Sequence, residues 1–175
     1  MANVCIGFRP GSMALMEIGR QDPTKRSQPV QALHRSDDPH GWHELPALPD
    51  VSVRRSRFIN VSICDDSVVI EAGFQDRVGD PTVGSVAIHE HRIQARADVR
   101  TLTLTALSAD PRILPFRECP AAAESAQLML GAELGDFRSI VLDRLAGTSG
   151  CTHLNDALRG FADVPVLLNA LHAHR

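Results

Sequence analysis

The stretch from Gly147 to Leu154 contains the residues best suited to chemistry. It reads Gly-Thr-Ser-Gly-Cys-Thr-His-Leu and separates Cys151 from His153 by one residue. The apolar spacing that follows is helical, so we expect the thiol and the imidazole on the opening turn of a helix. Unpaired backbone N–H groups and the helix dipole favour a thiolate there. A thiolate beside a histidine base is suited to nucleophilic catalysis, and the same two side chains are also ordinary zinc ligands.

Other residues are expected to join this pair. We predict His89 as the third member of a catalytic set with Cys151 and His153, and we expect His91, Cys119 and Arg55 to contact substrate. No cofactor is predicted, and zinc is the alternative. The residues that would bind zinc are His89, Cys119, Cys151 and His153.

A plainer interpretation applies to each residue alone. Cys151 could be a small buried side chain and His153 a hydrogen-bonded core imidazole, as such residues often are. Asp156 could orient a histidine or be an acid favoured in a first helical turn. Arg55 and Arg57 could bind an anion or lie on an exposed strand edge.

Residues 53–107 alternate with period two, which predicts four antiparallel strands. The first two, at 53–63 and 68–74, form a hairpin around Asp65 and Asp66. The third, between Val86 and Val99, places His89 and His91 on its apolar face, so both histidines are expected to point inward. The fourth runs from 101 to 107 and is expected to end at the Asp110-Pro111 pair.

After Pro115 the pattern becomes helical. Cys119-Pro120 predicts the start of a helix over 121–133, and Asp136 the start of a second that ends at Gly147. A third contains Leu154, Leu158 and Phe161 on one face and is broken or kinked by Pro165. The fold class is therefore α+β, with an antiparallel sheet of about four strands followed by three helices packed on one face.

Residues 1–50 show no sustained period and contain many prolines. We expect an extended, mostly irregular N-terminal arm that packs little against the domain, with Trp42 and Leu45 anchoring its end. Residues 51–175 are expected to form a single α+β domain.

Composition excludes several classes of function. The net charge is −3 with both signs interspersed, which argues against a nucleic-acid-binding surface. No apolar run reaches the roughly 18 residues of a membrane span, and the first residues do not resemble a signal peptide, so we expect a cytoplasmic protein with neither nucleic acid nor membrane as partner. Four widely spaced cysteines are then free thiols or metal ligands. A phosphate-binding loop, a dinucleotide fingerprint and a serine elbow are missing from the sequence.

The part of the chain from about 55 to 168 resembles a bacterial family called domain of unknown function 2889. The resemblance rests on Gly150-Cys151-Thr152-His153-Leu154, on Ile88-His89-Glu90 and on Pro115 through Cys119-Pro120. Glu90-His91 departs from the family's usual Asp-Met. The resemblance implies a fold boundary and a set of residues, but no reaction.

Two functions remain open from the sequence. The first is a small-molecule enzyme of bacterial metabolism, of the lyase or hydrolase type, with a Cys/His site at the sheet–helix junction; a homo-oligomer is compatible with this reading. The second is a non-catalytic protein whose Cys/His cluster is a zinc site or ordinary core.

Overall fold

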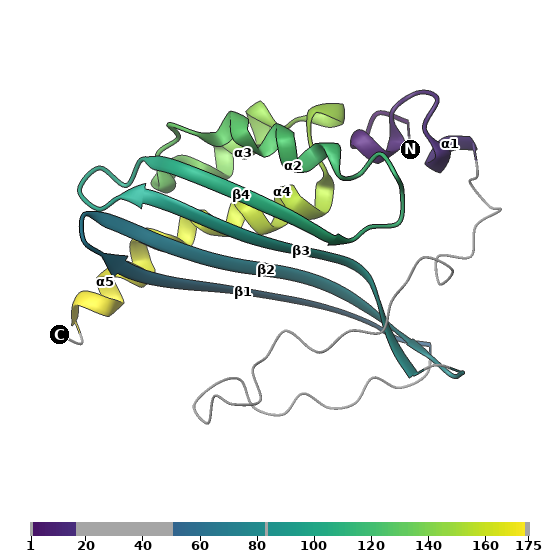
Figure 1. The fold of residues 1–175 in the computed structure, drawn as a ribbon, viewed down its shortest axis with the longest axis horizontal. Coiled ribbons are helices and arrows are strands. Elements are labelled where there is room, and N and C mark those ends of the chain that lie inside the picture. Colours follow the sequence, from purple (N-terminus) through teal and green to yellow (C-terminus); the bar gives the residue numbers. More distant parts are fainter. Residues whose placement is uncertain (1, 17–50, 83, 174–175) are drawn as a thin grey trace.

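The computed structural model describes residues 2–16, 51–82 and 84–173. Four strands form one antiparallel sheet in the order β1-β2-β3-β4, so each strand pairs with its neighbour in sequence (Figure 1). The strands are β1 (Val53–Cys64), β2 (Ser67–Asp80), β3 (Gly84–Asp98) and β4 (Leu104–Ile113). The predicted four-stranded antiparallel sheet is confirmed.

Helices follow the sheet and cover one of its faces (Figure 1). Four are α-helices after the strands: α2 (Ala121–Ser125), α3 (Phe137–Arg144), α4 (Thr152–Arg159) and α5 (Val164–Ala173). Short 3₁₀ helices extend two of them, at Ala126–Met129 after α2 and at Gly160–Asp163 between α4 and α5. The α+β class, with a four-stranded antiparallel sheet followed by three helical stretches, is confirmed.

The inner face of the sheet follows the predicted alternation. Ile70, Ala72 and Phe74 of β2 are buried, and they pair with Ala95, Ile93 and His91 of β3 in the register of the sheet. Helix α4 has the predicted rotation, because Leu154, Leu158 and Phe161 are all buried against this face. Apolar burial of this kind is the main favourable contribution to folding.

Several boundaries differ from the prediction, since β2 extends to Asp80 rather than 74 and β4 begins at Leu104 rather than 101. The first helix does not reach residue 133, because a 3₁₀ turn ends at Met129 and Gly131 adopts a φ of 77°. Strand β4 continues through Pro111 to Ile113 rather than ending at Asp110-Pro111. A proline cannot donate to a sheet ladder, but β4 is an edge strand of the described sheet, so Pro111 is tolerated there.

The first residues of the chain pack against the domain. Cys5 and Ile6 are 7% exposed, Ala14 is buried, and the amide of Ile6 donates to the carbonyl of Gly150 at 2.8 Å. This N-terminal segment, residues 2–16, includes the short helix α1 (Met13–Met16). Residues 2–16 therefore contribute more to the core than expected, whereas Trp42 and Leu45 lie outside the described residues.

Among the described residues, none of the helices combines the length and the apolar composition that crossing a bilayer requires.

Candidate functional site

The turn before α4 positions Cys151 and His153. A side chain on Gly150 would begin 2.5 Å from the carbonyl oxygen of Leu145 and 2.8 Å from Nδ2 of Asn155, so only glycine fits. Nδ2 of Asn155 donates to that same carbonyl at 2.8 Å, and the amide of Asn155 donates to the carbonyl of Cys151. Cys151 thereby becomes the extended N-cap residue of α4, and His153 lies on its first turn.

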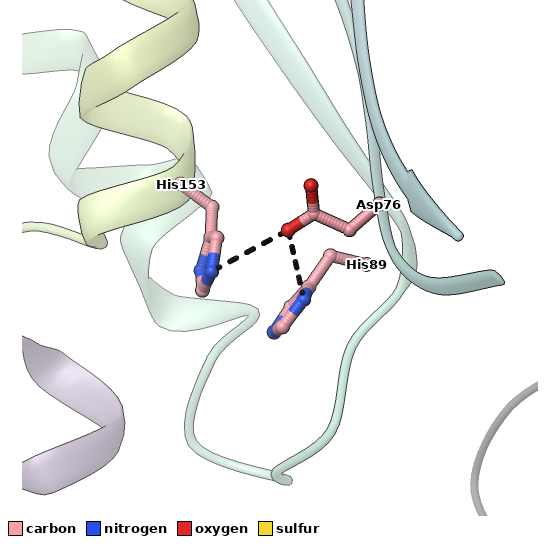
Figure 2. A group of neighbouring side chains, drawn as sticks. All are labelled: Asp76, His89 and His153. Carbon is pink, nitrogen blue, oxygen red and sulfur yellow. Dashed lines mark ion pairs between the residues drawn. The ribbon is translucent and has the colours of Figure 1, made fainter. Parts of the chain in front are cut away.

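His153 faces two residues of the sheet, Asp76 of β2 and His89 of β3 (Figure 2). Oδ2 of Asp76 is 3.4 Å from Nδ1 of His89 and 3.8 Å from Nε2 of His153. The two imidazole rings stack with their centroids 3.8 Å apart. One carboxylate oxygen thus lies close to two ring nitrogens that come from separate elements. These three donors form the one metal-ligand group found among the described residues.

The register of the sheet brings the first two of these residues together. Asp76 pairs with His89 across β2 and β3, and the pairing shifts directly afterwards, between Asp76 and Arg77. A β-bulge of this kind bends a strand and redirects its side chains, and bulges often lie beside functional sites. Asp76 continues the inward series of Ile70, Ala72 and Phe74 and replaces the apolar side chain expected next.

A family model matches residues 53–167, which span the whole sheet, the turn and α4. The chain belongs to the DUF2889 family. Members of this family are described as proteins of unknown function. A search of curated proteins found no match to the chain, and a search of solved structures found none either. The DUF2889 match therefore supports the boundaries of the domain, and the chemistry of the site has to be derived from its geometry.

The protonation states of the DUF2889 site follow from burial and neighbouring charge. Burial of Asp76 opposes its ionisation, but the interactions with His89 and Arg55 outweigh it and lower the pKa of the carboxyl to about 2. Burial, reinforced by the charge of His89, lowers the pKa of His153 to about 4. At neutral pH the site therefore contains a carboxylate beside a neutral His153, which is the form in which both side chains bind metals.

Arg55 holds the carboxylate in place. Its guanidinium donates to both oxygens of Asp76, from Nε to Oδ1 at 2.8 Å and from NH2 to Oδ2 at 3.0 Å, and it lies 4.9 Å above the ring of Phe74. A carboxylate has about four lone-pair positions, so Oδ2 retains capacity for another partner. Arg55 was expected either to bind an anion or to lie on an exposed strand edge, and its observed partner is Asp76.

Asp156 interacts with arginines rather than with a histidine. One of its oxygens accepts from Arg159 at 2.9 Å, and the other lies 3.2 Å from Arg57 and 3.7 Å from Arg55. The sequence interpretation in which Asp156 orients an imidazole is therefore not what the structure shows.

The thiol of Cys151 lies close to Nδ1 of His153, the ring nitrogen that does not face Asp76. Sγ of Cys151 is 3.8 Å from Nδ1 of His153, and Cys151 is 2% exposed. Burial raises the pKa of Cys151 despite the nearby backbone N–H groups of Leu154 and His153. At neutral pH Cys151 is therefore a thiol, because the helix terminus does not compensate for its burial.

Cys119 lies beside Cys5 of the N-terminal segment. A side chain on Gly7 would begin 3.2 Å from Sγ of Cys119 and 3.8 Å from Sγ of Cys5. Burial, with the nearby charge of Cys151, raises the pKa of Cys119 to about 12. Of the four expected zinc ligands, His89 and His153 belong to the three-donor group, Cys151 contacts the outer nitrogen of His153, and Cys119 belongs to neither contact.

His91 is on the inner face as predicted, but it is completely buried. Neither of its ring nitrogens has a hydrogen-bond partner among the described residues. Burial, reinforced by the charge of His89, lowers its pKa to about 4, so the ring is neutral. His91 therefore lies beneath the site, and its expected contact with substrate stays a prediction.

Sequence reasoning missed Asp76. The predicted second strand ended at Phe74, so the residue two positions further along was never assigned to a face. The signal was present, because Asp76 has the same parity as Val68, Ile70, Ala72 and Phe74. A carboxylate that continues an inward apolar series needs a partner, and here the partners are Arg55 and the two histidines.

Proposed function

We propose that this protein is a metal-dependent enzyme that acts on a small organic molecule, with Asp76, His89 and His153 as the ligands of one divalent ion. The observation that carries this proposal is the position of Asp76 Oδ2, which is 3.4 Å from one imidazole nitrogen and 3.8 Å from the other. Two ligands bonded to one ion at about 2.0–2.1 Å stand roughly 3.4 Å apart at a tetrahedral angle. Small rotations of the side chains, which separate the stacked rings, would bring all three donors onto one ion.

The surroundings of the three donors support a metal site. Ligating carboxylates and imidazoles are usually held by outer hydrogen bonds. Arg55 provides these bonds to Asp76, and Sγ of Cys151 is within reach of Nδ1 of His153, the nitrogen that would not face the ion. Because Asp76 has a pKa of about 2 and His153 a pKa of about 4, neither has to release a proton at neutral pH before it binds.

The number of donors favours catalysis over a structural role. Structural zinc sites normally use four protein ligands, whereas two histidines with one carboxylate leave positions open for water or substrate. His153 retains 26% side-chain exposure, so solvent reaches the group. A bound ion would activate water or polarise a substrate oxygen, which is the chemistry of hydrolases and of many lyases. We therefore keep the lyase or hydrolase class expected from the sequence and transfer the central role from Cys151 to Asp76.

Metal titration tests this function. Purified protein, stripped with a chelator, should bind about one Zn²⁺, Mn²⁺ or Co²⁺ per chain in calorimetry and should melt at a higher temperature with the ion present. Asp76→Asn and His153→Gln should each abolish stoichiometric binding. His172→Gln is the matched control, because His172 is an exposed residue in the last turn of α5. Binding that is unchanged in the two site variants would refute the proposed centre.

A further inference from the structure

Guanidinium groups line the solvent side of the proposed metal centre. The side chains of Arg55 and Arg57 are 49% and 53% exposed, whereas those of Asp76 and His89 are 6% and 14% exposed. Both arginines occupy inward positions of β1, which is an edge strand of the sheet that the described residues form. A molecule from solvent that approaches the centre from the β1 side would therefore meet the arginines.

The charges around the centre favour an anion. Three guanidinium groups, those of Arg55, Arg57 and Arg159, surround two carboxylates, those of Asp76 and Asp156. This count leaves an excess of one positive charge before any ion binds. Such an excess, to which a bound divalent ion would add, attracts an anionic group and repels a cationic one.

The two arginines of β1 are engaged differently. Arg55 holds both oxygens of Asp76 through two nitrogens, so turning it away would leave a buried carboxylate uncompensated. Within the described part of the chain, Arg57 forms one ion pair, a 3.2 Å contact from NH1 to Oδ2 of Asp156. The other oxygen of Asp156 is held by Arg159 at 2.9 Å, so Asp156 keeps a partner if Arg57 turns. An exposed ion pair of this kind contributes little stability, and Arg57 can exchange it for a ligand at small cost.

We propose that the substrate is a small organic carboxylate and that Arg57 binds its carboxylate group. This proposal rests on the proposed metal centre. A guanidinium presents two parallel N–H groups that match the two oxygens of a carboxylate. Arg57 fixes the acid group, and the rest of the substrate extends past Arg55 towards Asp76 and the two histidines. Arg57 is thus a determinant of specificity, separate from the three metal ligands.

Binding of small carboxylates to the metal-loaded protein tests this proposal. The probes are acetate, succinate and benzoate, each compared with its neutral amide and with inorganic phosphate, by calorimetry at low ionic strength. At least one carboxylate should bind while its amide does not, and Arg57→Gln should weaken that binding about tenfold or more. The matched control is Arg96→Gln, because Arg96 is an exposed arginine on the outer face of β3 and should leave binding unchanged.

The outcomes separate this proposal from the metal centre itself. Three results would overturn the substrate class while the protein still binds metal stoichiometrically. These are that no carboxylate binds, that Arg57→Gln leaves carboxylate binding unchanged, or that phosphate binds more tightly than every carboxylate. A chain that binds no metal but retains Arg57-dependent carboxylate binding would overturn the centre and keep the anion site. Metal content should be the same in Arg57→Gln as in the parent.

Discussion

Arg55 and Asp76 face each other across neighbouring strands, and the guanidinium holds both carboxylate oxygens, at 2.8 and 3.0 Å. This bidentate pair fixes the plane of the carboxylate and so directs Oδ2 towards His89 and His153. Hydrogen bonds behind metal ligands act in this way in many proteins. Arg55 is therefore a positioning residue for the proposed centre.

Arg55→Lys should weaken metal binding about 10–100-fold, the usual effect of losing an outer partner of a ligand. The lysine keeps the positive charge but cannot hold two oxygens in one plane, so the change tests orientation rather than charge. Calorimetric titration measures the affinity, and Arg96→Lys on the outer face provides the control. An unchanged affinity would show that Asp76 needs no support from Arg55.

The four cysteines should differ sharply in reactivity towards a thiol reagent. Cys64 is exposed in the first hairpin, whereas Cys5, Cys119 and Cys151 are buried. Burial raises the pKa of Cys119 to about 12 and also raises that of Cys151, which suppresses their thiolates at neutral pH. Ellman's reagent should modify one thiol quickly in the native protein and all four in urea. The native fast phase should disappear in Cys64→Ser. A fast phase that disappears in Cys151→Ser instead would support Cys151 as a nucleophile.

Phe161→Ala should reduce the free energy of unfolding by about 3–5 kcal/mol. The ring is completely buried and stacks on Phe137 with centroids 5.5 Å apart, so its removal leaves a cavity in the hydrophobic core between the helices. Leu142→Ala is the control, since Leu142 is 58% exposed and should change stability by less than about 0.5 kcal/mol. Urea unfolding of both variants gives the comparison. Similar values for the two would mean that the helical layer is less tightly packed than the structure indicates.

His91 should make the metal-free protein sensitive to acid. Its pKa is about 4 in the folded chain against an ordinary value of 6.5, so between these values the unfolded chain binds a proton that the folded chain excludes. The free energy of unfolding therefore falls as the pH is lowered from about 6.5 to 4, by roughly 3 kcal/mol at most for this residue. His153 acts in the same direction.

His91→Leu should remove the part of this loss that belongs to His91. Because the imidazole nitrogens have no partner among the described residues, the variant should be at least as stable as the parent at pH 7. Urea unfolding in a chelator at pH 7 and at pH 4.5 measures the difference. An equal loss in variant and parent would mean that the buried imidazole finds compensation on protonation.

Local patterns predicted the fold and two of the three residues of the site, His89 and His153. Alternation placed His89 and His91 on the inner face, because successive side chains of a strand point to opposite faces regardless of how the strand pairs in the sheet. Helical spacing gave the rotation of α4 in the same way, and hence the burial of Leu158 and Phe161. These features depend on neighbours in the sequence, so they can be predicted without knowledge of the tertiary structure.

The contribution of Asp76 depends on strand register, and the protonation state of Cys151 depends on burial. Asp76 meets His89 only because β2 and β3 pair in one register with a bulge beside the pair, and no local pattern fixes that register. The state of Cys151 was misjudged for a related reason. A helix terminus lowers a thiol pKa, but the depth of burial, which depends on the whole core, raises it further.

Helix α4 and the sheet each contribute donors to the proposed centre, with His153 on one side and Asp76 and His89 on the other. An ion bound by all three would be a cross-link between the two layers. Helix α4 could not lift from the sheet without breaking a metal–nitrogen bond, so its local opening would become rarer in the loaded protein. The amide hydrogens of α4 should then exchange with solvent more slowly when the ion is present, while those of β4, at the far edge of the sheet, keep their rate.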